Sequence, residues 1–349
     1  MDRYIGLDVH AASTTIAVVG PSGKRVKEQV VETNGKALIE MLKLIPGQRH
    51  VCLEEGTQAE WLHEILKPHA EEIVVAKVES SRGAKSDRRD AFALAELLRT
   101  DGVTTRVFKD VGSFGALREA CRVHTMVTND VVRTKNRIKS MFRSRGIPTD
   151  SSVYSKRERS AWLKKLPTNK RVPAQALYDE LDHQEELKDR CEEHLVREAR
   201  RHAFCRKLET CPGFGPIRAA QLMAITITPQ RFRTKRQFWS YCGLGIVMRS
   251  SSDWVRGVDN KWVRAKVATT RGLNFNHNHL AKHVLKAAAT TVVAQKTSPL
   301  YADYQRLLDA GTKPNLAKLT IARRIAAIAL AMWKRGEEYD PTKSSKLVS

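Results

Sequence analysis

The sequence lacks any segment that is apolar and long enough to direct a chain into a membrane. Its first ten residues, MDRYIGLDVH, have an acid at position 2 and no apolar core of signal-peptide length. The longest apolar run, Ile325–Trp333, follows two arginines and is about half of a membrane span. We therefore expect a cytoplasmic protein.

Cysteine is scarce, and no two cysteines stand in a CxxC pair. The six cysteines are Cys52, Cys121, Cys191, Cys205, Cys211 and Cys242. This scatter indicates neither a zinc ribbon nor a disulfide framework. We expect the thiols to be reduced and mostly buried.

Acidic residues are few relative to basic ones. The 349 residues include 38 Asp and Glu against 61 Lys and Arg, which gives a formal net charge of +23. Because basic side chains release condensed counterions when they neutralise phosphates, this excess favours a nucleic acid as partner over a merely basic protein. The expected location is then nucleoid-associated. The hydrophobic content of 42% is too high for a disordered chain, and the length allows two or three domains.

Residues 1–110 show the strand and helix order of an α/β domain. Strand patterns occur in YIGLDV, TTIAVVG, VKEQVVE, HVCLEE and EIVVAKV, and helix patterns in GKALIEMLKLI, AEWLHEILK and SDRRDAFALAELLR. The first three strands are joined by turns too short for crossovers. The sheet is therefore expected to be mixed.

Residues 111–205 have the pattern of two long helices, and we expect a coiled-coil hairpin that also serves oligomerisation. Apolar positions recur at steps of three and four within residues 112–146 and again within residues 174–203. The positions expected to be buried are Leu117, Cys121, His124, Val131, Ile138 and Phe142 in the first helix, and Leu177, Leu181, Cys191 and Leu195 in the second.

Charge is unevenly distributed along this hairpin. Residues 131–171 hold 13 Lys and Arg against 2 acids, a net +11, whereas residues 176–200 hold 9 acids against 4 bases. With only two acids, the basic segment has no acidic counterpart of its own to match its charge, so a nucleic-acid-binding strip is favoured over a solvated helix face. The candidate residues are Arg133, Lys135, Arg137, Lys139, Arg143 and Arg145.

Residues 206–349 are expected to form a helical domain. Its start, CPGFGPIRAAQLMAI, places Gly213 and Gly215 around one apolar residue, as in helix-hairpin-helix modules whose backbone N–H groups hold a phosphate. A tight turn between two packed helices would look similar. Farther on, a short helix leads into a loop rich in Gly and Ser, and two apolar helices close the chain. The predicted fold class is thus α/β followed by all-α.

Four acids are candidates for a metal site. Asp8 lies inside an apolar strand, where a carboxylate is costly unless it is paired or binds a metal. Glu54 ends another strand, and Asp87 and Asp90 share one face at the start of a helix. Such carboxylates suit Mg²⁺ or Mn²⁺, which can promote phosphodiester cleavage.

Each of the last three acids also has a simpler explanation. Asp87 could cap the helix, Asp90 could be an acid that the helix dipole favours, and Glu54 or its neighbour Glu55 could be a solvated strand end. Asp8 is the hardest to explain without a partner.

These motifs together resemble a known family. IGLDVH in a strand, an E-x-G or E-x-T-G element after another strand and D-x-x-D at a helix start are similar to the RuvC-like DEDD domain of the RNase H fold. That domain, followed by a coiled coil, PGxG and a GL-x(6)-S loop, resembles the DEDD transposases of the insertion-sequence one-ten family, relatives of the Piv-type invertases. The resemblance covers nearly the whole chain and keeps the order of the motifs.

The resemblance implies a role for individual residues. The family's four acids match Asp8, Glu54, Asp87 and Asp90, and its proposed nucleophilic serine, which forms a covalent link to DNA, matches Ser251. The chain departs from the pattern twice. It has Ser250-Ser251-Ser252 where the family usually has Ser-Gly, so either neighbour rivals Ser251, and EEGT in place of EATG makes Glu55 a rival to Glu54. Arg249 and Arg256 flank the serines and could hold the phosphate.

The resemblance also implies the reaction and the partners. It points to a transposase that cuts and exchanges strands of donor and target DNA, works as a dimer or tetramer, and is guided by a structured bridge RNA. Base pairing by that RNA would then supply sequence choice.

Two other functions stay open at this point. A junction resolvase or metal-dependent nuclease would need the four acids and the basic surface but not Ser251. An actin-like kinase or ATPase has a first phosphate loop that resembles IGLDVHAASTTIAVV. Its second Gly-rich loop is missing from this sequence, and a charge of +23 suits it poorly.

Overall fold

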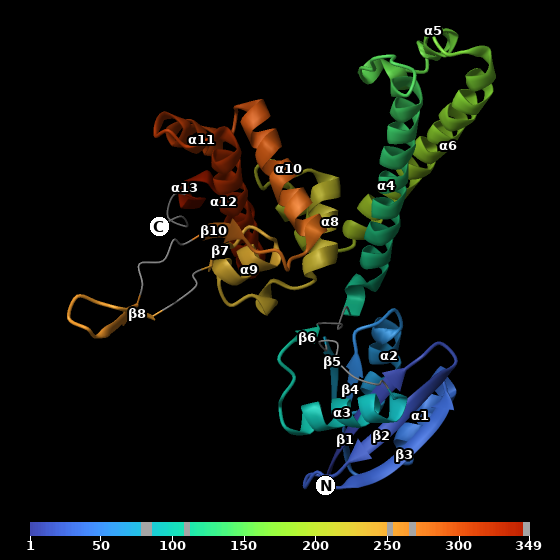
Figure 1. Ribbon diagram of the computed structural model, residues 1–349, viewed down its shortest axis with the longest axis vertical. Helices are drawn as coiled ribbons and strands as arrows, with labels where there is room; N and C mark the ends of the chain where they lie inside the picture. Colours follow the sequence, from blue (N-terminus) through green and yellow to red (C-terminus); the bar gives the residue numbers. More distant parts are fainter. Residues whose placement is uncertain (78–85, 108–111, 250–253, 265–269, 345–349) are drawn as a thin grey trace. The chain divides into compact units, whose positions relative to one another are not determined.

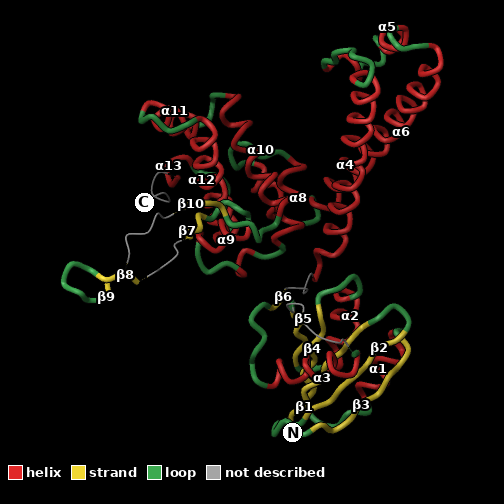
Figure 2. Tube along the Cα trace, viewed as in Figure 1, coloured by secondary structure: helices red, strands yellow, loops and turns green. Residues whose placement is uncertain are grey.

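The computed structural model describes residues 1–77, 86–107, 112–249, 254–264 and 270–344 and divides into two compact units, Met1–Gly112 and Ser113–Ser349 (Figure 1). Strands dominate the first unit and helices the second (Figure 2). Within the described residues, no helix is long and apolar enough to cross a membrane. All six cysteines are free thiols, and five of them are buried, as predicted.

The first unit is built on a mixed sheet of six strands in the order β3-β2-β1-β4-β5-β6. Strand β1 pairs antiparallel with β2 and parallel with β4, which is itself parallel to β5. The predicted elements are confirmed, and β6 is an addition that pairs antiparallel with β5. The elements are β1 (Asp2–Val9), β2 (Ser13–Val19), β3 (Arg25–Glu32), α1 (Gly35–Lys43), β4 (Gln48–Glu54), α2 (Ala59–Leu66), β5 (Glu72–Ala76), α3 (Asp87–Arg99) and β6 (Arg106–Val107).

The two faces of the sheet bury different residues. Leu7 and Leu53 belong to the core that α1 and α2 cover, together with Leu38 and Leu62. On the opposite face, α3 packs through Ala91 and its neighbours against β1 and β2. Because side chains alternate along a strand, the residues next to Leu7 and Leu53 turn toward the face of α3.

Helix α3 lies directly on β1 at Gly6. A Cβ atom at Gly6 would lie 1.9 Å from the carbonyl oxygen of Ala91 and 2.7 Å from the amide nitrogen of Ala95. Only a residue without a side chain allows this backbone contact. Gly6 therefore fixes how close the start of α3 comes to the end of β1.

The second unit begins with a helical hairpin of α4 (Gly115–Arg143) and α6 (Thr168–Ala199), joined through the short α5 (Arg159–Lys164). Near one end Leu117 shares a core with Leu195, and near the other Phe142 shares a core with Tyr178, so the helices are antiparallel. All six positions predicted in the first helix are buried. In the second helix Leu181 and Leu195 are buried, and Leu177 and Cys191 are half-buried. The second helix starts at Thr168 rather than near 174, with Pro173 inside it.

His124 makes the stability of this hairpin pH-dependent. Its ring is buried, and neither ring nitrogen has a hydrogen-bond partner within the described residues. Burial lowers the pKa of His124; the carboxylate of Glu192, 3.9 Å away, opposes this shift, and Lys188 adds to it. The unfolded chain therefore binds the proton more readily. Stability should be unaffected above about pH 6.5 and fall as the pH drops through the lower folded-state pKa.

Replacing His124 with leucine should remove this dependence. We expect thermal melting at pH 5 to show the variant more stable than the wild type, because the unsatisfied ring costs about 1–3 kcal/mol at any pH and proton binding by His124 in the unfolded wild type adds to this cost at low pH. The gap should shrink at pH 7.5, since the charged form is then absent in both states. His183→Gln, at an exposed position of α6, is the control and should follow the wild type. Parallel pH profiles for His124→Leu and wild type would contradict the prediction.

The rest of the second unit is mainly helical and shares a core with the base of the hairpin, where Cys121 and Leu195 pack with Leu285 and Ile325. One expectation needs correction, because the region after Leu244 contains four short strands in two ribbons rather than a loop alone. Strands of three or four residues are too short to show an alternating pattern. The elements are α7 (Ala203–Glu209), α8 (Pro216–Thr226), α9 (Lys235–Tyr241), β7 (Ile246–Arg249), β8 (Trp254–Arg256), β9 (Trp262–Arg264), β10 (Thr270–Leu273), α10 (His279–Gln295), α11 (Pro299–Asp309), α12 (Pro314–Arg335) and α13 (Pro341–Ser344).

Candidate active site and nucleic-acid interface

Asp8 and Glu54 lie side by side at the carboxyl ends of two parallel strands. Leu7 of β1 is the partner of Leu53 of β4, so the next residues, Asp8 and Glu54, follow in register. Both line a pocket of about 150 Å³ together with Thr57. By the alternation described above, Glu54, the last residue of β4, turns to the same face as Asp8, whereas Glu55 lies just beyond the strand and lines the same pocket.

Helix α3 brings Asp87 to the same edge of the sheet. Ser86 occupies the N-cap position, so Asp87 is the first helical residue and not the cap. The Oδ1 atom of Asp87 is 3.4 Å from Nε2 of His10, and that nitrogen is 3.3 Å from Oδ2 of Asp8. Asp90 lies in the same first turn of α3 and is half-buried.

His10 is the residue that the sequence reasoning missed. Ligand atoms of Asp8, His10 and Asp87 all lie within 4.8 Å of one another. A signal was present, because His10 stands two positions after Asp8 and directly follows the end of β1. The proximity of Asp87, however, depends on the packing of α3 and could not be read from the spacing of residues.

The electrostatics of Asp8 reflect partial burial among like charges. Burial raises the pKa of Asp8, and the carboxylates of Asp87 and Asp90 raise it further, while His10 opposes the shift. A cation bound here would relieve both the burial and the repulsion. The carboxylate oxygens are the ligands that hard divalent cations prefer, so this set of residues fits Mg²⁺ or Mn²⁺.

The basic strip on α4 is only partly available, and the premise that it lacks acidic partners is wrong. Lys135 lies 2.7 Å from Glu185 and Arg137 lies 3.4 Å from Glu180, both on α6. Arg133 pairs with Asp130 on its own helix. The sequence placed these acids on the second helix but could not show that the hairpin brings them into register with the bases.

Three residues of the strip remain open for contact. Arg143 and Arg145 are exposed, and neither forms an ion pair with any described residue. Lys139 is half-buried and lies over the ring of Tyr154, 5.4 Å from its centroid. The available part of the strip is therefore the C-terminal end of α4 and the residues just after it.

The two glycines of the PGFG turn differ in their surroundings. Gly213 has a positive φ of 78°, and a Cβ there would lie 2.3 Å from the carbonyl oxygen of Ala288 on α10. Its own carbonyl accepts a hydrogen bond from Arg218. Gly215 is the N-cap of α8, and a Cβ there would meet nothing within 4 Å. Packing thus explains Gly213, whereas Gly215 has open space beside a helix start.

The proposed serine nucleophile lies outside the described residues, as do Ser250 and Ser252. Arg249 ends β7, and its backbone pairs with Thr270 of β10. Arg256 ends β8, is exposed, and donates a hydrogen bond to the side chain of Asn260 at 3.2 Å. Both arginines thus stand on short strands at the borders of the serine segment.

Comparison with known protein families shows which family the chain belongs to. A family model for the DEDD transposases of IS110 elements matches residues 5–145, and a second model, the transposase IS116/IS110/IS902 family, matches residues 205–305. Together they cover more than two thirds of the chain. The chain belongs to the IS110 family of transposases. It is therefore an enzyme that acts on DNA. No curated protein matches the chain.

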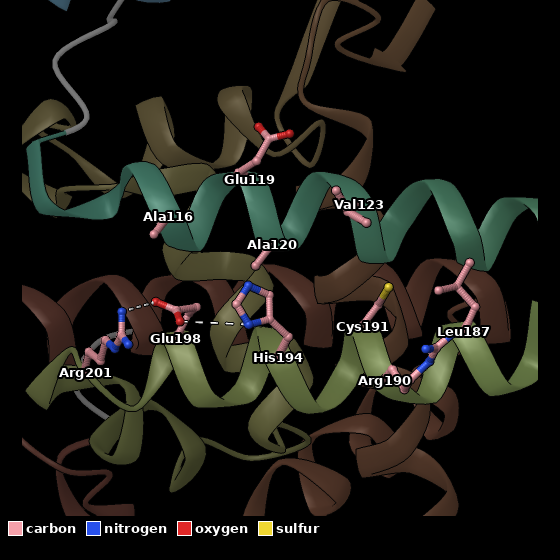
Figure 3. A pocket seen from close by; sticks show the side chains of 10 residues that line it. All are labelled: Ala116, Glu119, Ala120, Val123, Leu187, Arg190, Cys191, His194, Glu198 and Arg201. Atoms are coloured by element: carbon pink, nitrogen blue, oxygen red, sulfur yellow. Dashed lines mark hydrogen bonds and ion pairs between the residues drawn. The ribbon is translucent and has the colours of Figure 1, made fainter.

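The hairpin of this IS110 transposase contains a pocket between α4 and α6 (Figure 3). Its volume is about 450 Å³, and small or apolar side chains such as Ala120 and Val123 form one wall. On the other wall His194 lies beside Glu198, which also binds Arg201 at 2.7 Å. Nearby on α4, Met126 is 57% exposed. The pocket holds none of the acids predicted for catalysis.

A second groove in the transposase lies between α10 and α12 and is strongly basic. Its volume is about 460 Å³, and three lysines, Lys282, Lys286 and Lys318, line it with Asn315 and Thr290. The sequence from 260 to 336 holds 14 Lys and Arg against only 2 acids, and neither helix contains an acid. This groove suits the phosphates of a DNA backbone.

We expect these lysines to contribute to the salt dependence of DNA binding. Changing all three to glutamine should reduce the slope of log K against log salt by about 2.7, since each phosphate contact on duplex DNA contributes about 0.9. The measurement is a titration of duplex DNA at several salt concentrations. The same change at Lys24, Lys36 and Lys43, which are exposed on the first unit, is the matched control. Equal slopes for the groove variant and wild type would rule the groove out as a phosphate site.

Proposed function

We propose that this transposase exchanges DNA strands with a cluster of acids that binds a divalent cation and with Ser251 as the nucleophile. The observation that carries the first half is the convergence of Asp8, His10 and Asp87 within 4.8 Å, with Glu54 at the neighbouring strand end. Residues from two strand ends and one helix meet there because β1, β4 and α3 share one edge of the fold.

The acids would hold Mg²⁺ or Mn²⁺. Asp8, Glu54, Asp87 and Asp90 are the proposed ligands, and His10 adds a nitrogen donor that the family motif does not include. Such a cation stabilises the charge that develops on the oxygens of a phosphodiester during cleavage. The chain's own contribution is to hold the carboxylates on rigid strands and one helix, so that little rearrangement is needed.

Ser251 would supply the covalent step. Its hydroxyl oxygen attacks the scissile phosphorus, one DNA oxygen departs, and the hydroxyl proton passes to that oxygen directly or through water, so that a phosphoserine link replaces the broken bond and a free DNA hydroxyl is released. The link conserves the energy of that bond for rejoining. Support for this part is the match of the second family model, which spans the serine segment, and the presence of Arg249 and Arg256 on both sides.

The decisive experiment is the capture of the covalent adduct. The transposase is incubated with end-labelled DNA carrying its element's ends, quenched in detergent and analysed for labelled protein, and the modified peptide is located by mass spectrometry. Wild type should give an adduct on the peptide with Ser251, and Ser251→Ala should give none. Ser250→Ala and Ser252→Ala are matched controls that should still form it. Undiminished cleavage by Ser251→Ala without an adduct would favour the metal-dependent nuclease.

The proposal includes a guide RNA and an oligomer. An RNA that pairs with donor and target DNA would account for sequence choice, with Arg143 and Arg145 available to hold a backbone. A dimer or tetramer would provide the acids and serines for several strands, and the exposed Val123 and Met126 of α4 offer an apolar surface for association. Sequencing the nucleic acid that co-purifies with the protein tests the first point, because a defined RNA is expected.

A further inference from the structure

The residues just after the serine segment form a small ribbon with an internal repeat. The tripeptide Trp-Val-Arg occurs at 254–256 and again at 262–264, and the two copies pair antiparallel as β8 and β9. In this register Trp254 is opposite Arg264, and Arg256 is opposite Trp262. The repeat therefore sets a tryptophan against an arginine at both ends of the ribbon. We call residues 254–264 the Trp–Arg hairpin.

Both tryptophans of the Trp–Arg hairpin are largely exposed. Trp254 is 57% and Trp262 is 62% exposed, and the guanidinium of Arg256 lies 5.6 Å from the centre of the Trp262 ring. At the turn, Val258 is fully exposed. The contact of Arg256 with Trp262 stabilises the ribbon itself, but both tryptophan rings keep large surfaces in water.

Such high exposure is unusual for two tryptophan side chains. Tryptophan is mostly buried in folded proteins, and contiguous apolar patches on a surface mark binding sites. A ribbon of two three-residue strands has no core of its own, so the rings do not serve to bury each other. Their exposure points to a ligand with flat, stackable faces.

The charge of the hairpin selects among such ligands. The sequence of the hairpin has three basic residues, Arg256, Lys261 and Arg264, and one acid, Asp259, so the hairpin carries a net positive charge. Aromatic rings among basic side chains are the surface that single-stranded nucleic acids use, because bases stack on the rings while cations contact the phosphates. An apolar protein partner or a second copy of this basic chain matches the charge less well.

We infer that the Trp–Arg hairpin stacks unpaired bases of DNA next to the bond that is cut. Duplex bases are hidden in their stack, so a strand that is exchanged has to be opened, and its freed bases then need a surface. The hairpin follows the serine segment directly in sequence, which keeps the stacking platform close to the strand being cut. The position next to the cut bond rests on the proposed role of Ser251, whereas the stacking of bases rests on the exposed rings and on the DNA activity of the family.

The test measures binding without cleavage. The full-length protein, in buffer containing EDTA, is titrated into a fluorescent oligothymidylate and, separately, into a blunt duplex of equal length. Trp254→Ala and Trp262→Ala should each weaken binding of the single strand about 5- to 150-fold, the loss that corresponds to one stacked base, with little change for the duplex. Trp254→Phe and Trp262→Phe should keep most of the affinity, because phenylalanine still offers a ring.

Two controls keep the outcome interpretable. Trp61→Ala removes a tryptophan that is 37% exposed on α2 and should leave single-strand binding unchanged. Arg256→Gln should lower the salt slope for the single strand by about 0.7. Equal loss on single strand and duplex, or no loss on either, would overturn the inference. So would tryptophan-dependent binding of oligouridylate without binding of oligothymidylate, or a change of oligomeric state with unchanged affinity. Since no cleavage is measured, failure here would not bear on the acids or on Ser251.

Discussion

Asp8→Asn should reduce DNA strand cleavage by roughly a thousandfold or more. The carboxylate lies between His10 and Glu54, and its loss would remove several kcal/mol of charge stabilisation, where each 1.36 kcal/mol is about a factor of ten in rate. The fold should survive. Because burial and neighbouring acids raise the pKa of Asp8, its ionised form is less favourable in the metal-free folded protein than in the unfolded chain. Stability from this group is present at low pH and is lost as the pH rises through the raised pKa.

Cleavage rate and melting temperature, measured on the same preparation, check this prediction. In EDTA at neutral pH, Asp8→Asn should melt at or above the temperature of the wild type, and added Mg²⁺ should stabilise only the wild type. Glu54→Gln and Glu55→Gln form a matched pair, since both residues line the pocket beside Asp8 but only Glu54 belongs to β4. Glu54→Gln is expected to be inactive and Glu55→Gln active. Full activity of Asp8→Asn would eliminate the metal site proposed here.

Gly6→Ala should be the most damaging single methyl group in the first unit. The new Cβ would lie 1.9 Å from a backbone carbonyl oxygen of α3, so the helix has to move away from β1. Overpacking of this kind typically costs about 1–3 kcal/mol. The new Cβ would meet backbone atoms of α3, so no flexible side chain can move aside to relieve the clash. The shift also carries Asp87 away from Asp8, so cleavage should fall together with stability.

Gly20→Ala is the control for this change. A Cβ at Gly20 would meet its neighbours at 3.5 Å or more, which is ordinary contact, and the free energy of unfolding should change by no more than about 0.5 kcal/mol. Chemical denaturation and cleavage assays of both variants give the comparison. Wild-type cleavage by a destabilised Gly6→Ala would show that the position of α3 does not matter to the site.

Much of the first unit follows from local sequence. Alternation in IGLDV and HVCLE, and the apolar spacing of the helices, identify every element but the two-residue β6. Asp8 was identifiable because a carboxylate in an apolar strand conflicts with its surroundings, and such conflicts concentrate at functional sites. The burial pattern of α4 could also be predicted from the sequence. In a long helix the spacing of apolar residues marks the buried face, and this spacing depends little on contacts with distant residues.

The remainder depends on contacts between distant residues. The proximity of His10 and Asp87 comes from the crossing of α3 over Gly6, and the pairing of Lys135 with Glu185 comes from the register of the hairpin. The spacing of residues within a single segment predicts neither the crossing of α3 over β1 nor the register between α4 and α6. Strands β7 to β10 are missed because three or four residues cannot show a period, and because β7 and β10 pair residues up to 27 positions apart in the sequence.

The groove between α10 and α12 bears on how the transposase searches for its site. Lysines on flexible stems grip phosphates at any sequence, so the complex they form is equally stable at every position along a duplex. A protein held in this way moves along DNA by sliding and short hops, and the time spent on each molecule shortens as salt rises. If the predicted salt dependence is found, search and recognition are separate tasks: Lys282, Lys286 and Lys318 set the speed of the search, and other parts of the complex read the bases.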